Sequence, residues 1–205
     1  MKAFSLQMAM QTALFAIVCL APGRAGGAEA LQAKIEYCQF CHGSSGRGYR
    51  GAFPVPRIAG QTTEYMESQL QAFVERKRER NNPIVMSKTH GVGTPMRRAL
   101  TAHFAALNPR PVGGTPRHLS GAGKKIYEAG VPGASVPACA VCHGADAKGN
   151  GANSRLAGQL YSYTVKEMVN WSKERGDTSS VMATIARGMT RQQVEAVAVY
   201  LSNLK

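Results

Sequence analysis

Apolar residues recur along much of the chain at intervals of three and four positions, the spacing of one face of an α-helix. We see no convincing run in which apolar and polar residues alternate, as they do in a half-buried strand. The pattern predicts helices over residues 31–37, 63–79, 121–128 and 162–173, followed in each half of the chain by one last helix. The fold is therefore predicted to be all-α.

Local signals mark the starts of the two last helices. Thr190 and Gln193 form a capping box, in which each side chain satisfies a backbone N–H of the first turn. In the first half Thr94 precedes Pro95, so we expect Thr94 to cap the helix and Pro95 to be its first residue. The apolar residues that continue the helix after Gln193 are Val194, Val197, Ala198 and Leu201.

An internal repeat divides the chain. The matching pairs are residues 58–61 with 156–159, Tyr65 with Tyr163, and Phe73 with Trp171. The segment between the two copies is dense in Pro and Gly and cannot continue a helix. We therefore predict two tandem domains, residues 31–108 and 118–205, joined by a linker over residues 109–117. Each domain is small for an unaided apolar core.

The first thirty residues have the pattern of a cleavable signal peptide. Lys2 precedes an apolar run over about residues 13–21, and small residues follow up to Ala30. The run is short for a membrane span, so a retained anchor is the less favoured alternative. Cleavage before Leu31 and export to the periplasm are expected.

The sequence Cys-x-x-Cys-His occurs at residues 38–42 and again at residues 139–143, each time followed by Gly. This is the attachment signature of a c-type haem, because cysteines three apart on a helical turn reach the two vinyl groups of one porphyrin and the next residue ligates the iron. Half of a zinc site and a dithiol redox pair are the alternatives, and the repeated His-Gly argues against both. Two covalently bound haem c groups are predicted, held by Cys38, Cys41, His42, Cys139, Cys142 and His143.

A second iron ligand must come from elsewhere in each half. Met86 and Met182 lie at corresponding positions between the middle and last helices, and a thioether favours ferrous iron and raises the reduction potential. A methionine here is otherwise flexible core filling. The ligands that remain open as alternatives are Met96, Met189, His90 and His103.

These motifs together resemble the dihaem cytochrome c4 family over nearly the whole chain after Leu31. The resemblance rests on the two haem motifs and on residues 56–61, 82–86 and 136–144. It implies two class I cytochrome c domains facing each other, with haem propionates near the shared interface. It also implies His42 and Met86 on the first iron, and His143 and Met182 on the second.

The chain departs from the family pattern at two places. The proline whose carbonyl holds the proximal imidazole is present as Pro56 but is replaced by Ser154 in the second half, which makes that support less fixed. Residues 87–93 replace a more regular helical approach, which either exposes the methionine side of the first haem or reflects ordinary loop drift.

The formal net charge is +13 at pH 7, and residues 76–80 form the densest basic run. A basic surface steers a carrier toward acidic redox proteins, such as membrane respiratory complexes, or toward an anionic membrane surface. The alternative for residues 76–80 is a solvated helix end. Nucleic acid is not an expected partner, because an exported haem protein rarely meets it.

The sequence thus predicts a periplasmic electron carrier between respiratory-chain components, such as a quinol-oxidising complex and a terminal oxidase or reductase, and not an enzyme. The alternative is the dihaem electron-accepting subunit of a periplasmic dehydrogenase, for example one that oxidises sulfide with a flavin. A dihaem enzyme that uses a thiolate ligand is disfavoured, because the only cysteine outside the haem motifs is Cys19, within the signal segment. A gas sensor would need an open iron position, which two candidate methionines argue against.

Overall fold

The computed structural model describes residues 23–51, 53–78, 90–113, 118–173 and 180–205, which form helices and no strand. The helices are α1 (Gly23–His42), α2 (Thr63–Val74), α4 (Thr94–Ala105), α5 (Ser120–Ala129), α6 (Ala140–His143), α7 (Tyr161–Lys173), α8 (Val181–Gly188) and α9 (Arg191–Asn203). The expectation of an all-α chain is confirmed.

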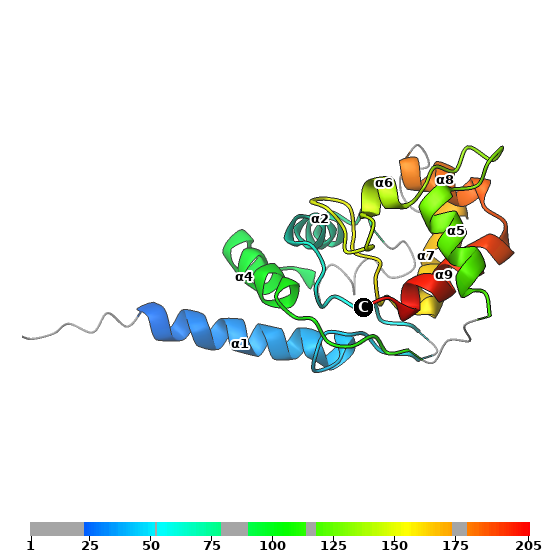
Figure 1. Ribbon diagram of the computed structural model, residues 1–205. Coiled ribbons are helices and arrows are strands. Elements are labelled where there is room, and N and C mark those ends of the chain that lie inside the picture. Colours follow the sequence, from blue (N-terminus) through cyan, green and yellow to red (C-terminus); the bar gives the residue numbers. More distant parts are fainter. Residues whose placement is uncertain (1–22, 52, 79–89, 114–117, 174–179) are drawn as a thin grey trace, which may run out of the picture.

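The helices group into two bodies that follow the order of the chain (Figure 1). In the first, α4 packs against both α1 and α2; in the second, α5 crosses α9 and α7 packs against α8 and α9. The chain end lies between the two bodies, where the C-terminal segment meets the loop at Gly158. Each half therefore has its own helical packing, and the loops around the repeated sequence form the contact between them.

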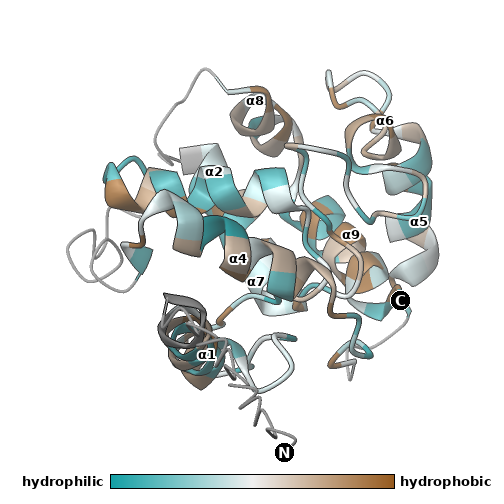
Figure 2. Cartoon of the chain, turned by 90° about the vertical axis from the view of Figure 1, so that its left-hand side faces the viewer, coloured by the Kyte–Doolittle hydropathy of each residue, from teal (hydrophilic) through white to brown (hydrophobic). Residues whose placement is uncertain are grey.

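Each body has a separate hydrophobic core. The first core consists of Ile35, Met66, Leu100 and Phe104, and the second of Tyr127, Ala147, Ala157, Val197 and Leu201. Figure 2 shows hydrophobic and hydrophilic residues side by side on most helices, the mark of amphipathic elements with one buried face.

The crossing of α5 and α9 depends on a glycine. A Cβ at Gly123 would overlap the backbone carbonyl of Ala196, so only glycine permits this approach. One turn later Tyr127, which is fully buried, donates its hydroxyl to the carbonyl of Gly144 at 2.6 Å. The crossing thus ties the first and last helices of the second domain to the residue that follows its haem motif.

The helix boundaries agree with the sequence in part. The capping box at Thr190 is present, with both hydrogen bonds formed. The expected cap at Thr94 is wrong: Gly93 is the cap residue, no side chain caps this helix, and Thr94 is already helical. The helix expected over residues 63–79 ends at Val74, and Arg76 adopts a φ of 56° that no helix continues through.

The N-terminal helix α1 begins at Gly23, inside the segment predicted to be a signal peptide. The cleavage site of the signal peptide and the boundaries of the two domains remain predictions. Among the described residues, no helix combines the length and the apolar character needed to cross a membrane.

Candidate functional site

The first haem motif forms the last turn of α1. Both cysteines have free thiols: Cys41 is exposed, whereas Cys38 is partly buried and packs against the first core. His42 is the final residue of the helix. Partial burial raises the pKa of the Cys38 thiol. Phe40, between the two cysteines, is almost fully exposed.

The imidazole of His42 is fixed by the loop that carries the repeat. Its Nδ1 lies 2.8 Å from the carbonyl oxygen of Pro56. Burial lowers the pKa of His42 to about 4, against the opposing effect of that hydrogen bond, and His90 and Arg78 lower it further. A neutral ring that donates from Nδ1 presents the Nε2 lone pair, the arrangement of a metal-ligating histidine.

The second haem motif reaches the same geometry by a different path. The helix α5 ends at Ala129 and a loop follows. Cys139 then directly precedes the short helix α6, which carries Cys142 and His143. The Nδ1 atom of His143 lies 2.8 Å from the carbonyl oxygen of Ser154, and burial lowers the pKa of the imidazole. The carbonyl therefore supports the histidine even though serine replaces proline there.

The donor set fits a covalent haem at each motif. In both, two unpaired thiols lie on one helical turn, and the adjacent histidine has Nδ1 engaged by a backbone carbonyl. Each site therefore supplies the thiols for two thioether bonds and one nitrogen ligand on the same helical segment.

The structure describes only some of the candidates for the second iron ligand, the one on the side of the haem opposite the histidine. Met86 lies outside the described residues, whereas Met182 lies in the first turn of α8, which Ser180 caps. In the first domain the ring of His90 stacks on Phe73 with centroids 4.4 Å apart and lies edge-on to the ring of His42 at 6.4 Å. Two imidazoles that share one metal ion, each bonded at about 2 Å, have centroids roughly 6 Å apart. The distance between the rings therefore keeps His90 as an alternative distal ligand.

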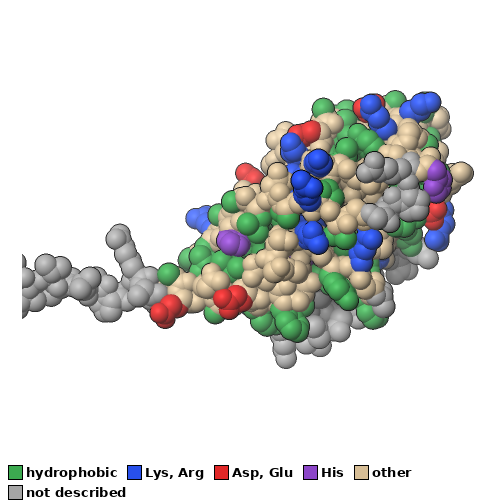
Figure 3. All heavy atoms as spheres, turned by 60° about the horizontal axis from the view of Figure 1, so that its bottom comes forward, with side chains coloured by type: hydrophobic (Ala, Val, Ile, Leu, Met, Phe, Trp, Pro, Cys, Tyr) green, Lys and Arg blue, Asp and Glu red, His purple; other side chains and the backbone are tan. Residues whose placement is uncertain are grey.

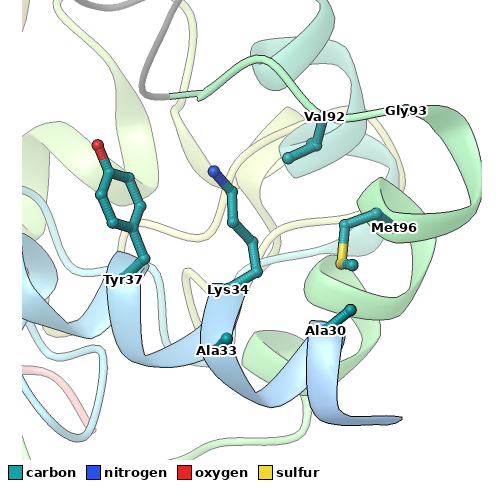
Figure 4. A pocket seen from close by; sticks show the side chains of 7 residues that line it. All are labelled: Ala30, Ala33, Lys34, Tyr37, Val92, Gly93 and Met96. Carbon is teal, nitrogen blue, oxygen red and sulfur yellow. The ribbon is translucent and has the colours of Figure 1, made fainter. Parts of the chain in front are cut away.

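The competing methionines belong to the hydrophobic cores. Met96 packs against the first core and lines a hollow of about 450 Å³ between α1 and the start of α4, where Figure 4 shows it opposite Ala30, Ala33 and Lys34. Met189 packs against the second core. His103 lies in the last turn of α4 with its ring edge-on to Phe104, at 5.0 Å between centroids.

The two repeat loops meet each other at the centre of the domain contact. The carboxamide of Gln159 bonds the backbone N–H and C=O of Arg57, and the carboxamide of Gln61 bonds those of Arg155. Burial and the charge of Arg155 lower the pKa of Arg57 to about 10, so it stays charged at neutral pH. Sequence reasoning saw these glutamines only as members of a repeat.

The structure describes the basic run only as far as Arg78, and residues 79–80 lie outside the described residues. Arg78 is only 8% exposed, and its guanidinium donates to the hydroxyl of Tyr163 at 2.6 Å and lies 3.7 Å from Glu167, both in the second domain. It also lies over the ring of Phe73 at 4.7 Å. Lys77 points to solvent. Arg78 is therefore part of the domain contact. For this residue, the predicted docking face and the alternative of a solvated helix end are both wrong.

Other basic side chains do reach the surface. Figure 3 shows Lys and Arg side chains spread among hydrophobic ones over one face of the molecule. The large hydrophobic residues that are at least half exposed include four aromatic ones, Tyr37, Phe40, Tyr49 and Phe53, all in the first domain.

Comparison with known proteins gives one family. The model of the cytochrome c family matches residues 27–108 and again residues 120–205. Cytochrome c-552 of Acidithiobacillus ferridurans is 34% identical over 201 residues, which cover 93% of this chain and 86% of that protein. The thiosulfate dehydrogenase electron acceptor of Thiomonas intermedia is 31% identical over 170 residues, covering 80% of this chain and 77% of that protein.

A solved structure has the same fold over most of its length. The cytochrome c4 of Acidithiobacillus ferrooxidans superposes with a TM-score of 0.74 at 35% sequence identity, covering 82% of this chain and 99% of that one. The likeness therefore extends to two tandem domains and not to a single haem module.

Proposed function

The chain belongs to the cytochrome c family, with two tandem domains like those of cytochrome c4, and from this premise we propose that it carries electrons in the periplasm between respiratory-chain components. The expected donor is a quinol-oxidising complex, and the expected acceptor is a terminal oxidase or reductase. When bound, the haem irons supply two one-electron couples. The protein's own residues attach the haems, set the ligand field and present a docking surface.

The observation that carries this proposal is the duplicated support of the two histidines. His42 and His143 each end a haem motif and each direct Nδ1 to a backbone carbonyl at 2.8 Å. The loops that supply the carbonyls contact each other across the domain boundary. Two redox sites held by adjoining loops suit a carrier that takes up and releases electrons within one molecule.

For the iron ligands we propose His42 with Met86 in the first domain and His143 with Met182 in the second. The packing of Met96 and Met189 into the hydrophobic cores supports this choice over those two residues. His90 is the competing ligand of the first iron, because its ring lies 6.4 Å from that of His42.

Near-infrared spectroscopy of the oxidised protein tests the ligands. Ferric His/Met haem has a weak charge-transfer band, and Met182→Leu should remove about half of its intensity. Met86→Leu should remove the remainder, whereas His90→Ala, the control in the same loop region, should leave the band intact. A band that is half-sized in the wild type and unchanged by Met86→Leu would assign His90 to the first iron.

Docking is proposed to use the first domain, where exposed aromatic and basic side chains occur together. Phe40 is 89% exposed and Phe53 is 83% exposed, and aromatic residues are enriched in protein contacts. Positive charge nearby would speed the encounter with an acidic partner. Peripheral association with an anionic membrane surface would use the same charge.

A second candidate function is the electron-accepting subunit of a periplasmic dehydrogenase. The specific observation in its favour is the 31% identity to a thiosulfate dehydrogenase electron acceptor. Both functions need the same two redox sites, so they differ in the protein that supplies the electrons and not in the chemistry of this chain.

Stopped-flow reduction separates the two functions. The carrier proposal predicts fast reduction by a quinol-oxidising complex and oxidation by a terminal oxidase, both slowing as salt rises from about 10 to 200 mM, because the Debye length falls from roughly 30 to below 10 Å. Fast reduction only by a dehydrogenase with its substrate, with no dependence on salt, would assign the subunit function instead.

A further inference from the structure

At the contact between the two domains, two glutamines each bond the backbone of the opposite domain. Gln159 accepts the N–H of Arg57 at 2.9 Å and donates to the carbonyl of Arg57 at 3.0 Å. Gln61 does the same for Arg155, at 2.6 Å and 3.1 Å. All four residues are at most 7% exposed, so water competes little for these bonds.

Each of these bonds reaches the opposite domain's proximal histidine through one peptide group. The N–H of Arg57 and the C=O of Pro56 are the two ends of the same peptide, and that C=O accepts the Nδ1 proton of His42 at 2.8 Å. A continuous chain therefore runs from His42 through the peptide to Gln159.

The second domain has the same chain with the partners exchanged. The peptide between Ser154 and Arg155 accepts the proton of His143 at its carbonyl and donates its N–H to Gln61. Serine leaves this peptide less fixed than proline does, so the bond from the first domain also holds its orientation.

The electronic effect has a definite direction. An amide whose N–H donates a hydrogen bond carries more negative charge on its carbonyl oxygen, which strengthens the bond that this oxygen accepts. A stronger bond from Nδ1 makes the imidazole a more basic ligand, and this stabilises ferric over ferrous iron. Loss of the glutamine should therefore raise the reduction potential.

We propose that Gln61 and Gln159 are positioning residues that act across the domain boundary: Gln61 tunes the haem of the second domain, and Gln159 tunes the haem of the first. This inference rests on the proposed ligation by His42 and His143. It gives each domain control over the redox site of the other through hydrogen bonds alone.

The test uses Gln61→Met and Gln159→Met in the full haem-loaded chain, since methionine keeps the length of the side chain but makes no amide bond. A redox titration followed by NMR reports each haem separately. With Gln61→Met, the ferrous fraction of the second haem at a fixed ambient potential should rise up to about tenfold, equivalent to about 59 mV. The first haem should change little, and Gln159→Met should give the mirror result.

Two further variants separate tuning from mere domain cohesion. Gln61→Glu keeps an acceptor and makes it charged, so the N–H of Arg155 is bound more strongly and the second haem's potential should fall more than the first's. Thr62→Val removes the cross-domain bond from the Thr62 hydroxyl to the carbonyl of Gly151, together with the cap that this hydroxyl gives α2, but removes no bond of either histidine's peptide. This control should leave both potentials unchanged.

A shift at the haem in the same domain as the substitution, an equal shift at both, or no shift at either would overturn the proposal. If Gln159→Met retains too little haem, the opposite shifts expected for Gln61→Glu and Gln61→Met still test the proposal at the second haem. Pyridine haemochrome analysis of the wild type, which should give two haems per chain, tests the cofactor assignment independently.

Discussion

Replacing Tyr127 by Phe removes one hydroxyl group from the centre of the second domain. The side chain is fully buried, and its hydroxyl donates to the carbonyl of Gly144, the residue after His143, at 2.6 Å. The substitution opens almost no cavity, so the main effect is the loss of this bond at a buried acceptor. We expect a cost of about 1–3 kcal/mol in the free energy of unfolding.

Thermal unfolding of the haem-loaded protein, followed by circular dichroism, measures this cost. Each kcal/mol should lower the midpoint by roughly 2–4 °C for a chain of this size. The matched control is Tyr200→Phe: the Tyr200 ring lies 5.6 Å from that of Tyr127, but its hydroxyl has no hydrogen-bond partner among the described residues. The control should change the midpoint by much less.

The pH dependence carries a second signature. Burial raises the pKa of Tyr127, so the folded state holds this proton more tightly than the unfolded state does. The resulting stability is complete below the ordinary tyrosine pKa of about 10 and is lost progressively above it. The advantage of the wild type over Tyr127→Phe should therefore shrink above about pH 10. Equal midpoints for the two proteins at pH 7, or a gap that widens at high pH, would refute this reasoning.

Three other substitutions test separate features. Gly123→Ala should destabilise the second domain by about 1–3 kcal/mol in denaturant unfolding because its methyl group meets the backbone of α9, whereas Gly121→Ala, with open space around it, should not. Thr190→Ala should cost about 1 kcal/mol in the same assay through loss of the capping box, and an unchanged midpoint would contradict it. Phe53→Ser should slow reduction by the physiological donor without moving either potential, and an unchanged rate would exclude this residue from the docking surface.

The sequence was informative for most of the local features, with the cap expected at Thr94 as the exception. Two haem motifs, the capping box at Thr190 and the carbonyl support of the histidines lie within short stretches, and the structure has them as expected. Ser154 stands in the second half where Pro56 stands in the first, and the sequence already indicated that Ser154 could support His143, because a backbone carbonyl is present whatever the side chain. The distal residue Met86 lies outside the described residues, so its assignment stays a prediction.

Long-range packing was not accessible in the same way. A charge run gives no sign that one of its members is buried, and the partner that draws Arg78 inward, Glu167, is 89 positions away in the sequence. Gln61 and Gln159 carried a usable signal, since a polar residue repeated inside an otherwise apolar loop requires a buried partner. Only the fold reveals that each one finds its partner in the other copy.

The reciprocal pattern of the glutamine bonds has the form of an isologous contact, in which the same patch is used on both sides. Exchanging the two domains leaves the set of bonds unchanged, so two separate copies of one ancestral domain could have formed it as a twofold dimer. Such a dimer would dissociate on dilution. Joining the halves in one chain makes the association intramolecular, so its strength no longer depends on protein concentration and each half becomes free to diverge around a fixed contact.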